Sequence, residues 1–262
     1  MSGGLQPTTR FSGRAADYVR ARPTYPDSLV DLLEADLGLS PGNVMADIGS
    51  GTGLSAEPFL RRGYSVICVE PNPDMRAAAE RQLGDYAGFR SIAGSAEATG
   101  LPPSSVDCVV VAQAFHWFDA DAAKAEFARI LRAGWVILMW NTRRTEGSTF
   151  LQGYERLIQE FGTDYPKIRQ RTARLTTGSA ATDRVLDRFF AGAYERRVLE
   201  NWQDLDLDGL KSRVVSASYM PAVDSPAFAP MTAALARLYE ANSADGRVRL
   251  EYDLEVYCGR VA

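Results

Sequence analysis

The sequence has little of what metal-binding and membrane-spanning proteins use. It contains three cysteines and one histidine among 262 residues, and Cys68, Cys108 and Cys258 stand far apart without a CxxC pair. Zinc sites need clustered thiols and imidazoles, so no metal site is predicted. A membrane helix needs about 20 apolar residues, and no apolar run in the sequence is that long. Residues 1–20 lack the apolar segment of a signal peptide. We therefore expect reduced, buried thiols in a cytoplasmic protein that does not contact a membrane.

An excess of positive charge is also absent. The 29 Lys and Arg side chains are outnumbered by 33 Asp and Glu, which gives a net charge of −4 and a pI near 5.2. Nucleic-acid binders usually carry a basic balance or stripe, so no nucleic acid is expected as a partner. With 46% hydrophobic and 24% charged residues, and no repeat or low-complexity tract, the chain is predicted to be globular with one substantial core, or one core plus a small cap.

Short apolar segments alternate with helical segments up to residue 141. We expect strands at 43–49, 64–70, 88–94, 106–114 and 135–141, and helices at 55–63, 73–84 and 121–134. Segment 106–114 is almost continuously apolar, as in a strand that is covered on both faces. The alternation predicts a doubly wound α/β fold with a mostly parallel sheet and right-handed crossovers.

The alternation stops after residue 141. Residues 142–193 carry helical patterns and no obvious strand, so a helical insertion is predicted there. Strand patterns return at 193–201 and 247–261, with helical patterns at 207–216 and 230–242 between them. These strands are predicted to extend the edge of the sheet to seven strands, with the C-terminal strand antiparallel.

Three glycines spaced two apart, Gly49, Gly51 and Gly53, end the first predicted strand, which contains Asp47. Glycines at the carboxyl end of such a strand let a loop turn tightly and bring its N–H groups against a ligand. The GxGxG spacing matches neither GxGxxG nor GxxxxGK[ST]. Glu70 ends the second strand, where a carboxylate can accept hydrogen bonds from two ribose hydroxyls. A plain tight turn and a solvated Glu70 are the alternatives.

At these residues the sequence resembles class I S-adenosylmethionine-dependent methyltransferases. The resemblance is carried, over about residues 40–141, by ADIGSGTG, VEPNPDM, GSAEATGLP, VDCVVVAQAFHWFD and FARILRAGWVILMWN. Segment 16–26 (ADYVRARPTYP) and the C-terminal EYDLEVYCGRV resemble a branch of small-molecule enzymes similar to trans-aconitate methyltransferase. The resemblance implies a single methyltransferase domain over 1–262. Its parts are cofactor-covering helices in 1–40, a cofactor-binding core in 41–141, a helical insertion or lid in 142–193, and strands and helices completing the sheet in 194–262.

The resemblance implies S-adenosyl-L-methionine as the cofactor. The residues that it implies for cofactor binding are Tyr18, Arg22, Asp47, Gly49, Ser50, Gly51, Glu70, Asn72, Met75, Ser95, Ala96, Glu97 and Gln113. Among these, Arg22 would pair with the cofactor carboxylate, and Asn72 and Met75 would flank the adenine. Ser95 stands where many relatives have aspartate, so its contact with the adenine amine would lack a charge-assisted bond.

In methyl transfer the enzyme chiefly supplies alignment and a dry pocket. His116 lies two residues past the fourth predicted strand, where it could act as a general base, or could, with Trp117, only shape the wall of the site. Arg143 and Arg144 follow the fifth strand. We predict that one of them anchors an acidic acceptor through its planar guanidinium; a solvated pair of arginines is the alternative.

These observations predict methylation of a small molecule, at the oxygen of a carboxylate or hydroxyl, by a monomer or homodimer. An NAD(P)-dependent Rossmann oxidoreductase is the first rival, and the GxGxG spacing disfavours it. An RNA or protein methyltransferase is the second, and the acidic balance and lack of an appended binding domain disfavour it. A cofactor-binding protein without catalysis stays open.

Overall fold

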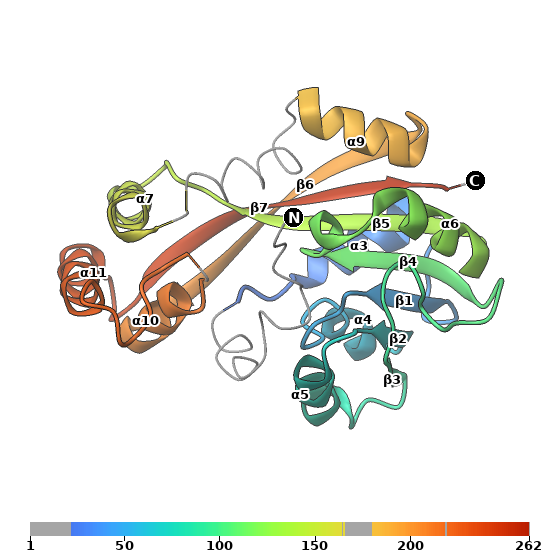
Figure 1. The fold of residues 1–262 in the computed structure, drawn as a ribbon, viewed down its shortest axis with the longest axis horizontal. Coiled ribbons are helices and arrows are strands. Elements are labelled where there is room, and N and C mark those ends of the chain that lie inside the picture. Colours follow the sequence, from blue (N-terminus) through green and yellow to red (C-terminus); the bar gives the residue numbers. More distant parts are fainter. Residues whose placement is uncertain (1–21, 164, 166–179, 218, 262) are drawn as a thin grey trace, which may run out of the picture.

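The structure is a computed structural model that describes residues 22–163, 165, 180–217 and 219–261. Its described residues form a seven-stranded sheet in the order β3-β2-β1-β4-β5-β7-β6 (Figure 1). The strands are β1 (Val44–Ile48), β2 (Ser65–Val69), β3 (Phe89–Ile92), β4 (Val106–Ala112), β5 (Leu131–Arg143), β6 (Tyr194–Leu205) and β7 (Val248–Gly259). Pairings from β3 to β5 are parallel, whereas β7 is antiparallel to both β5 and β6. The predicted mostly parallel sheet with an antiparallel C-terminal strand is confirmed.

Helices cover both faces of the sheet and one end of it (Figure 1). They are α3 (Asp27–Leu37), α4 (Glu57–Arg61), α5 (Pro73–Leu83), α6 (Ala120–Ile130), α7 (Thr149–Phe161), α9 (Ala180–Phe190), α10 (Leu207–Val215) and α11 (Phe228–Asn242), with a 3₁₀ turn, η1 (Phe115–Trp117). Apolar side chains of α6 and α9 pack on one face, and those of α3, α4 and α5 on the other. Helices α7, α10 and α11 form a third core with the ends of β6 and β7, which we call the end cluster. None of these helices, over the described residues, combines the length and the apolar character that a membrane span requires.

The boundary between α6 and β5 differs from the predicted one. The pattern predicts a helix over 121–134, but β5 already begins at Leu131, whose backbone pairs with Val106. A Cβ at Gly134 would lie 1.6 Å from the carbonyl oxygen of Asp107. Gly134 therefore lets β5 pass close to β4 at an irregular start of the strand, instead of ending the helix.

The three cysteines are buried free thiols, as the sequence predicts. Burial raises the pKa of each thiol, and that of Cys258 to about 12. Because the thiolate is the reactive and metal-binding form, these side chains act as small apolar groups of the core.

Candidate active site

The loop after β1 is fastened to the end of β2. The N–H of Gly49 donates to the carbonyl of Val69 at 2.8 Å. The N–H of Gly51 donates to Oε2 of Glu70 at 3.0 Å, and the other carboxylate oxygen, Oε1, accepts from the N–H of Asn72 at 2.8 Å. The Glu70 carboxylate thus joins the glycine loop to the start of α5. Two backbone donors orient it at the carboxyl ends of β1 and β2, where doubly wound sheets bind ligands.

The three glycines of this loop have different structural roles. All have positive φ angles, of 67° at Gly49, 57° at Gly51 and 84° at Gly53. A Cβ at Gly49 would lie 2.9 Å from Cβ of Ala114, and one at Gly53 would lie 2.3 Å from Cδ1 of Leu83. At Gly51 no described atom lies within 4 Å of the added Cβ. Gly49 and Gly53 therefore serve internal packing, whereas the missing side chain of Gly51 leaves space for a ligand.

Asp47 lies beneath this loop with one oxygen unsatisfied. Its side chain is 1% exposed, and Oδ2 accepts a hydrogen bond from the hydroxyl of Ser55 at 2.6 Å. Oδ1 is buried and has no hydrogen-bond partner among the described residues. Burial raises the pKa of Asp47 to about 7; the bond from Ser55 opposes this rise and the charge of Glu70 adds to it. A buried acceptor without a donor indicates a group that a ligand completes.

Glu70 is prepared to accept further hydrogen bonds. The residue is 9% exposed, and burial raises the pKa of its carboxyl, although the bonds from Asn72 and Gly51 oppose the rise. Each carboxylate oxygen carries one hydrogen bond from the backbone, and a carboxylate has about four acceptor sites. Two sites are therefore left, which matches the two hydroxyl donors of a ribose.

The segments implied to flank the adenine are anchored by hydrogen bonds. Asn72 caps α5, since its Oδ1 accepts from the N–H groups of Asp74 and Met75 at 2.9 and 3.1 Å. Met75 and Ala96 are buried apolar groups, at 4% and 3% exposure. Ser95 closes a turn with Ala98, its N–H donating to the carbonyl of that residue at 3.1 Å.

The chain leaves β4 through a strained residue. Gln113 has a φ angle of 59°, which is unfavourable for a residue with a side chain. Its N–H donates to the carbonyl of Met139 at 2.9 Å, and its Nε2 to the carbonyl of Asn141 at 3.4 Å. Both contacts are with β5, so they hold the strained turn at the carboxyl end of β4. Strain of this kind concentrates at functional sites.

The turn η1 places His116 and Trp117 next to this position. Its first residue, Phe115, is buried against Phe189, with ring centroids 4.9 Å apart, and against Trp140 at 6.3 Å. His116 and Trp117 are half-buried, with their rings 4.8 Å apart. Phe115 thus anchors the turn in the core and positions the following two side chains at the ends of the strands.

Of the two N-terminal residues implied for the cofactor, Tyr18 lies outside the described residues. Arg22 is half-buried, and its Nη2 lies 3.4 Å from the carbonyl oxygen of Ser216, just after α10. This contact places Arg22 at the end cluster.

The two arginines after the predicted fifth strand both have carboxylate partners. Arg143 forms an ion pair with Glu155, donates to the hydroxyl of Tyr165 at 3.0 Å and lies over the ring of Tyr154 at 5.1 Å. Arg144 pairs with Asp253 at 2.7 Å on the other face of the sheet, where Glu251 and Glu200 are also within 4 Å. An acceptor would have to compete with these carboxylates, so the anchoring role of either arginine stays a prediction.

The sequence reasoning missed Arg213, which is 8% exposed in α10. It shares the buried face of that helix with Leu210 and Val214, at the i, i+3 and i+4 spacing of a core-facing helix. An arginine within an apolar stripe is the signal that could have found it, because charged residues are rarely buried without a function or a partner.

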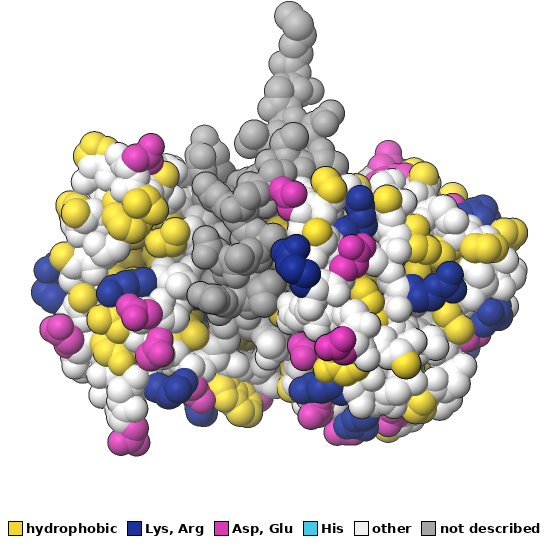
Figure 2. Space-filling model, turned by 90° about the horizontal axis from the view of Figure 1, so that it is seen from below, with side chains coloured by type: hydrophobic (Ala, Val, Ile, Leu, Met, Phe, Trp, Pro, Cys, Tyr) yellow, Lys and Arg dark blue, Asp and Glu magenta, His cyan; other side chains and the backbone are white. Residues whose placement is uncertain are grey.

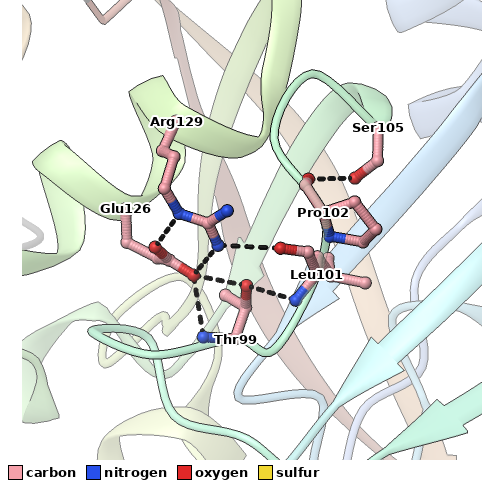
Figure 3. Close-up of polar contacts among 6 residues, drawn as sticks. All are labelled: Thr99, Leu101, Pro102, Ser105, Glu126 and Arg129. Atoms are coloured by element: carbon pink, nitrogen blue, oxygen red, sulfur yellow. Dashed lines mark hydrogen bonds and ion pairs between the residues drawn. The ribbon is translucent and has the colours of Figure 1, made fainter.

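A buried carboxylate fixes the segment after Ser95 onto α6 (Figure 3). Glu126 accepts from the N–H and the hydroxyl of Thr99, at 2.9 and 2.6 Å, and from two guanidinium nitrogens of Arg129 at 2.7 Å. Arg129 also donates to the carbonyl of Leu101 at 2.8 Å. Glu97 adds a second tie, because its Oε1 accepts from the N–H of Asp119 at 3.0 Å. The wall implied for the adenine is thus tied to the start and the middle of α6.

Glu126→Gln is expected to lower the free energy of unfolding by about 2 kcal/mol at pH 7. Its bonds with Arg129 and Thr99 hold the pKa of Glu126 at about 2, below its ordinary 4.5. Stability from a depressed carboxyl pKa is complete above 4.5 and is lost as the pH falls toward 2. Urea unfolding from pH 7 to 3 should therefore show the gap between the two proteins narrowing below pH 4.5. A gap that does not change with pH, or an equal effect of Glu80→Gln on the exposed face of α5, would contradict this role.

No group of three or more His, Cys, Asp or Glu side chains suited to a metal ion occurs within the described ranges.

The comparisons with known proteins agree with this fold. A family model described as a methyltransferase domain matches residues 46–139. An uncharacterized methyltransferase of Mycobacterium tuberculosis is 38% identical over 134 residues, which are 51% of this chain and 52% of that protein. An uncharacterized methyltransferase-like protein of Schizosaccharomyces pombe is 29% identical over 158 residues, 60% of each chain. The chain thus spans about half the length of the curated relatives it matches first.

A solved structure shares the whole architecture. A candidate type II methyltransferase from Anaeromyxobacter dehalogenans superposes with a TM-score of 0.62 over 92% of this chain and 98% of its own, at 22% identity. At this identity the likeness establishes the fold, which agrees with the strand order described above. The family resemblance inferred from the sequence is confirmed. The matched segment identifies residues 46–139 as a methyltransferase domain.

Proposed function

We propose that this protein transfers the methyl group of S-adenosyl-L-methionine to a small-molecule acceptor. The observation that carries the proposal is the buried Glu70 carboxylate, which binds the N–H groups of Gly51 and Asn72 and keeps two acceptor sites for ribose hydroxyls. The family of residues 46–139 supports the same cofactor. A dinucleotide oxidoreductase would share the acid after β2 but would carry GxGxxG in this loop.

The residues of the site fit this cofactor group by group. Asp47 offers its unsatisfied Oδ1 to a cationic or N–H group, and the open side of Gly51 leaves room for close approach. Met75 and Ala96 supply apolar surface for a base. Gln113 presents its backbone where β4 ends, beside Met139 of β5. The remaining implied contacts, including that of Tyr18, stay predictions.

S-adenosylmethionine supplies an electrophilic methyl group on a sulfonium. The protein has to place an acceptor atom in line with it and to exclude water. We assign the acceptor side of the site to η1, where His116 and Trp117 stand beside the strained Gln113. His116 is the general-base candidate for a hydroxyl acceptor, whereas a carboxylate acceptor is already ionised and needs no base. Oxygen methylation is proposed on this basis.

A small acceptor is favoured over RNA by the surface charges. Figure 2 shows basic and acidic side chains interspersed on the face drawn, without a continuous basic area. An RNA-binding face would gather Lys and Arg along the path of the phosphates. Oligomeric state and cytoplasmic location stay predictions from the sequence.

Calorimetric titration with S-adenosylhomocysteine tests the proposal, with NAD as the control ligand. We expect saturable binding of S-adenosylhomocysteine and none of NAD. Transfer of labelled methyl to a panel of acids, phenols and amines then tests catalysis. Preference for NAD would reopen the oxidoreductase alternative, and cofactor binding without turnover of any acceptor would favour a protein that has lost catalysis.

Gly51→Ala should separate ligand binding from packing. Alanine at a φ of 57° costs about 1 kcal/mol, but its methyl group meets no described atom, so the fold should be little affected. The same methyl group would occupy the ligand space, and we expect the Kd for S-adenosylhomocysteine to rise about tenfold. Gly53→Ala is the matched comparison, because its Cβ would meet Leu83, so unfolding should change more than binding. The reverse ranking of the two variants would show that the loop does not face the cofactor.

A further inference from the structure

The end cluster contains a buried arginine, Arg213, that has no counter-ion among the described residues. Arg213 is 8% exposed, and its one hydrogen bond to a described residue runs from Nε to the hydroxyl of Tyr252, at 3.2 Å. Among the residues that the structure describes, no carboxylate pairs with it; its electrostatic partners are the hydroxyls of Tyr252, Tyr154 and Tyr219. Burying a guanidinium without an anion is unfavourable, so this position calls for one.

The neighbouring charges do not supply that anion. Arg143, the other buried guanidinium of the cluster, already uses Glu155, and both side chains of this pair are about nine-tenths buried. Tyr154 interacts with both arginines, which shows that they share one environment. Arg22 adds a further guanidinium beside the carbonyl of Ser216, at the end of the helix that carries Arg213. Two buried cations thus face one described carboxylate, and a single negative charge would balance them.

This excess of positive charge lies within reach of the proposed methyl-transfer site. Met139, whose carbonyl binds the backbone of Gln113, and Arg143 lie on the same face of β5, four residues apart. Four residues of strand span about 13 Å. Arg143 is in register with Tyr252, the hydroxyl partner of Arg213. Arg213 therefore stands about the length of a small organic molecule beyond the end of β4, on the side toward which the strands point.

Polar groups lie between Met139 and Arg143 on β5. Asn141, between the two positions on β5, accepts at its Oδ1 from Nδ2 of Asn201 at 3.0 Å, and its own Nδ2 is buried without a partner among the described residues. Nδ2 of Asn201 also donates to the carbonyl of Thr24 at 2.7 Å. A polar acceptor would find an unused donor here, between the end of β4 and Arg213.

We propose that Arg213 binds a carboxylate of the methyl acceptor, remote from the atom that receives the methyl group. The proposal rests on the proposed function and narrows it to acceptors that carry a carboxylate besides their nucleophilic atom. The Nη1 and Nη2 groups of Arg213 make no hydrogen bond to a described residue, and a guanidinium grips a carboxylate through two parallel N–H donors. Tyr252 acts as a positioning residue, because its hydroxyl accepts from Arg213 and donates to Oε1 of Gln203 at 2.8 Å.

The test compares acids with their amides on the complex with S-adenosylhomocysteine. Succinate, glutarate and salicylate are each titrated against the matching amide, which has the same shape but no charge. We expect at least one acid to bind the wild type about tenfold tighter than its amide. Arg213→Met should remove this preference and leave the Kd for S-adenosylhomocysteine unchanged. Arg213→Lys keeps the charge without the fork and should retain part of the preference. With a labelled-methyl assay, Arg213→Met should raise the KM of the acid and change its kcat little.

Arg237→Met, at an exposed position of α11, is the matched control and should behave as the wild type. Equal binding of acids and amides to the wild type, or an acid preference that survives in Arg213→Met, would overturn the carboxylate subsite and leave the methyltransferase proposal standing. A wild type that does not bind S-adenosylhomocysteine would instead refute the proposed function. If Arg213→Met does not fold, the binding of acids and amides to the wild type and to Arg213→Lys tests the proposal instead. Full preference for the acid in Arg213→Lys would contradict a contact that needs the guanidinium.

Discussion

Glu70→Ala is expected to weaken the binding of S-adenosylhomocysteine by about 100-fold or more. In the proposed complex each carboxylate oxygen accepts one ribose hydroxyl besides its backbone donor, and a hydrogen bond to a charged group contributes about 1.5–3 kcal/mol. Alanine also releases the N–H groups of Gly51 and Asn72, so the glycine loop and the start of α5 lose their connection. Loss of the two direct contacts and of the preorganised loop should act in the same direction. Calorimetry on wild type and variant measures the effect.

Two further variants separate these contributions. Glu70→Gln keeps the shape but replaces one acceptor oxygen by a donor, which must then face either a backbone N–H or a hydroxyl. We expect it to weaken binding by about tenfold, less than alanine does. Glu80→Ala removes an exposed carboxylate from α5 and should leave binding unchanged. Binding by Glu70→Ala equal to that of the wild type would remove the observation on which the proposed function depends.

The parts of the site that the sequence predicts are those set by local geometry. A strand followed by glycines, and an acid at the end of the next strand, occupy fixed places in a doubly wound sheet, so the facing of Gly51 and Glu70 follows from chain order. The different roles of the three glycines do not follow from chain order. The atoms that an added Cβ would meet at Gly49 and Gly53 belong to Ala114 and Leu83, which lie far along the chain. The early start of β5 at Leu131 likewise depends on its pairing with Val106, which no helical period reveals.

On the acceptor side of the site, too, chain order predicts only part of the arrangement. Sequence position predicts Arg143 and Arg144 at the carboxyl end of β5, but strand alternation sends them to opposite faces, and tertiary contacts give each a carboxylate. Arg213 comes from a helix about 70 residues later and reaches the same end through β7. Its proposed role depends on the absence of a carboxylate partner among the described residues, which is a property of the fold that a linear pattern does not encode.

Asp47→Asn is expected to stabilise the free protein at high pH and to weaken cofactor binding. Burial raises the pKa of Asp47 from 3.8 to about 7. A carboxyl whose pKa is raised on folding binds more protons in the native state, so its contribution to stability falls as the pH rises from 3.8 to 7 and stays low above that. The loss amounts to about 4 kcal/mol. Asparagine does not titrate, and its amide leaves one donor unpaired, which costs about 1–3 kcal/mol at all pH values.

The difference in unfolding free energy between Asp47→Asn and the wild type should therefore move in favour of the variant by several kcal/mol between pH 4 and 8, as urea unfolding can measure. A difference that is constant over this range would mean that Asp47 ionises normally in the folded protein. The unsatisfied Oδ1 explains why such a residue would be retained despite this cost. A cationic or N–H group of the cofactor would complete it, favour its ionised form and release a proton when it binds below about pH 7. Calorimetry in buffers of different ionisation enthalpy should detect that proton for the wild type and not for Asp47→Asn. The ionised Asp47 would thus lower the stability of the free protein and strengthen cofactor binding.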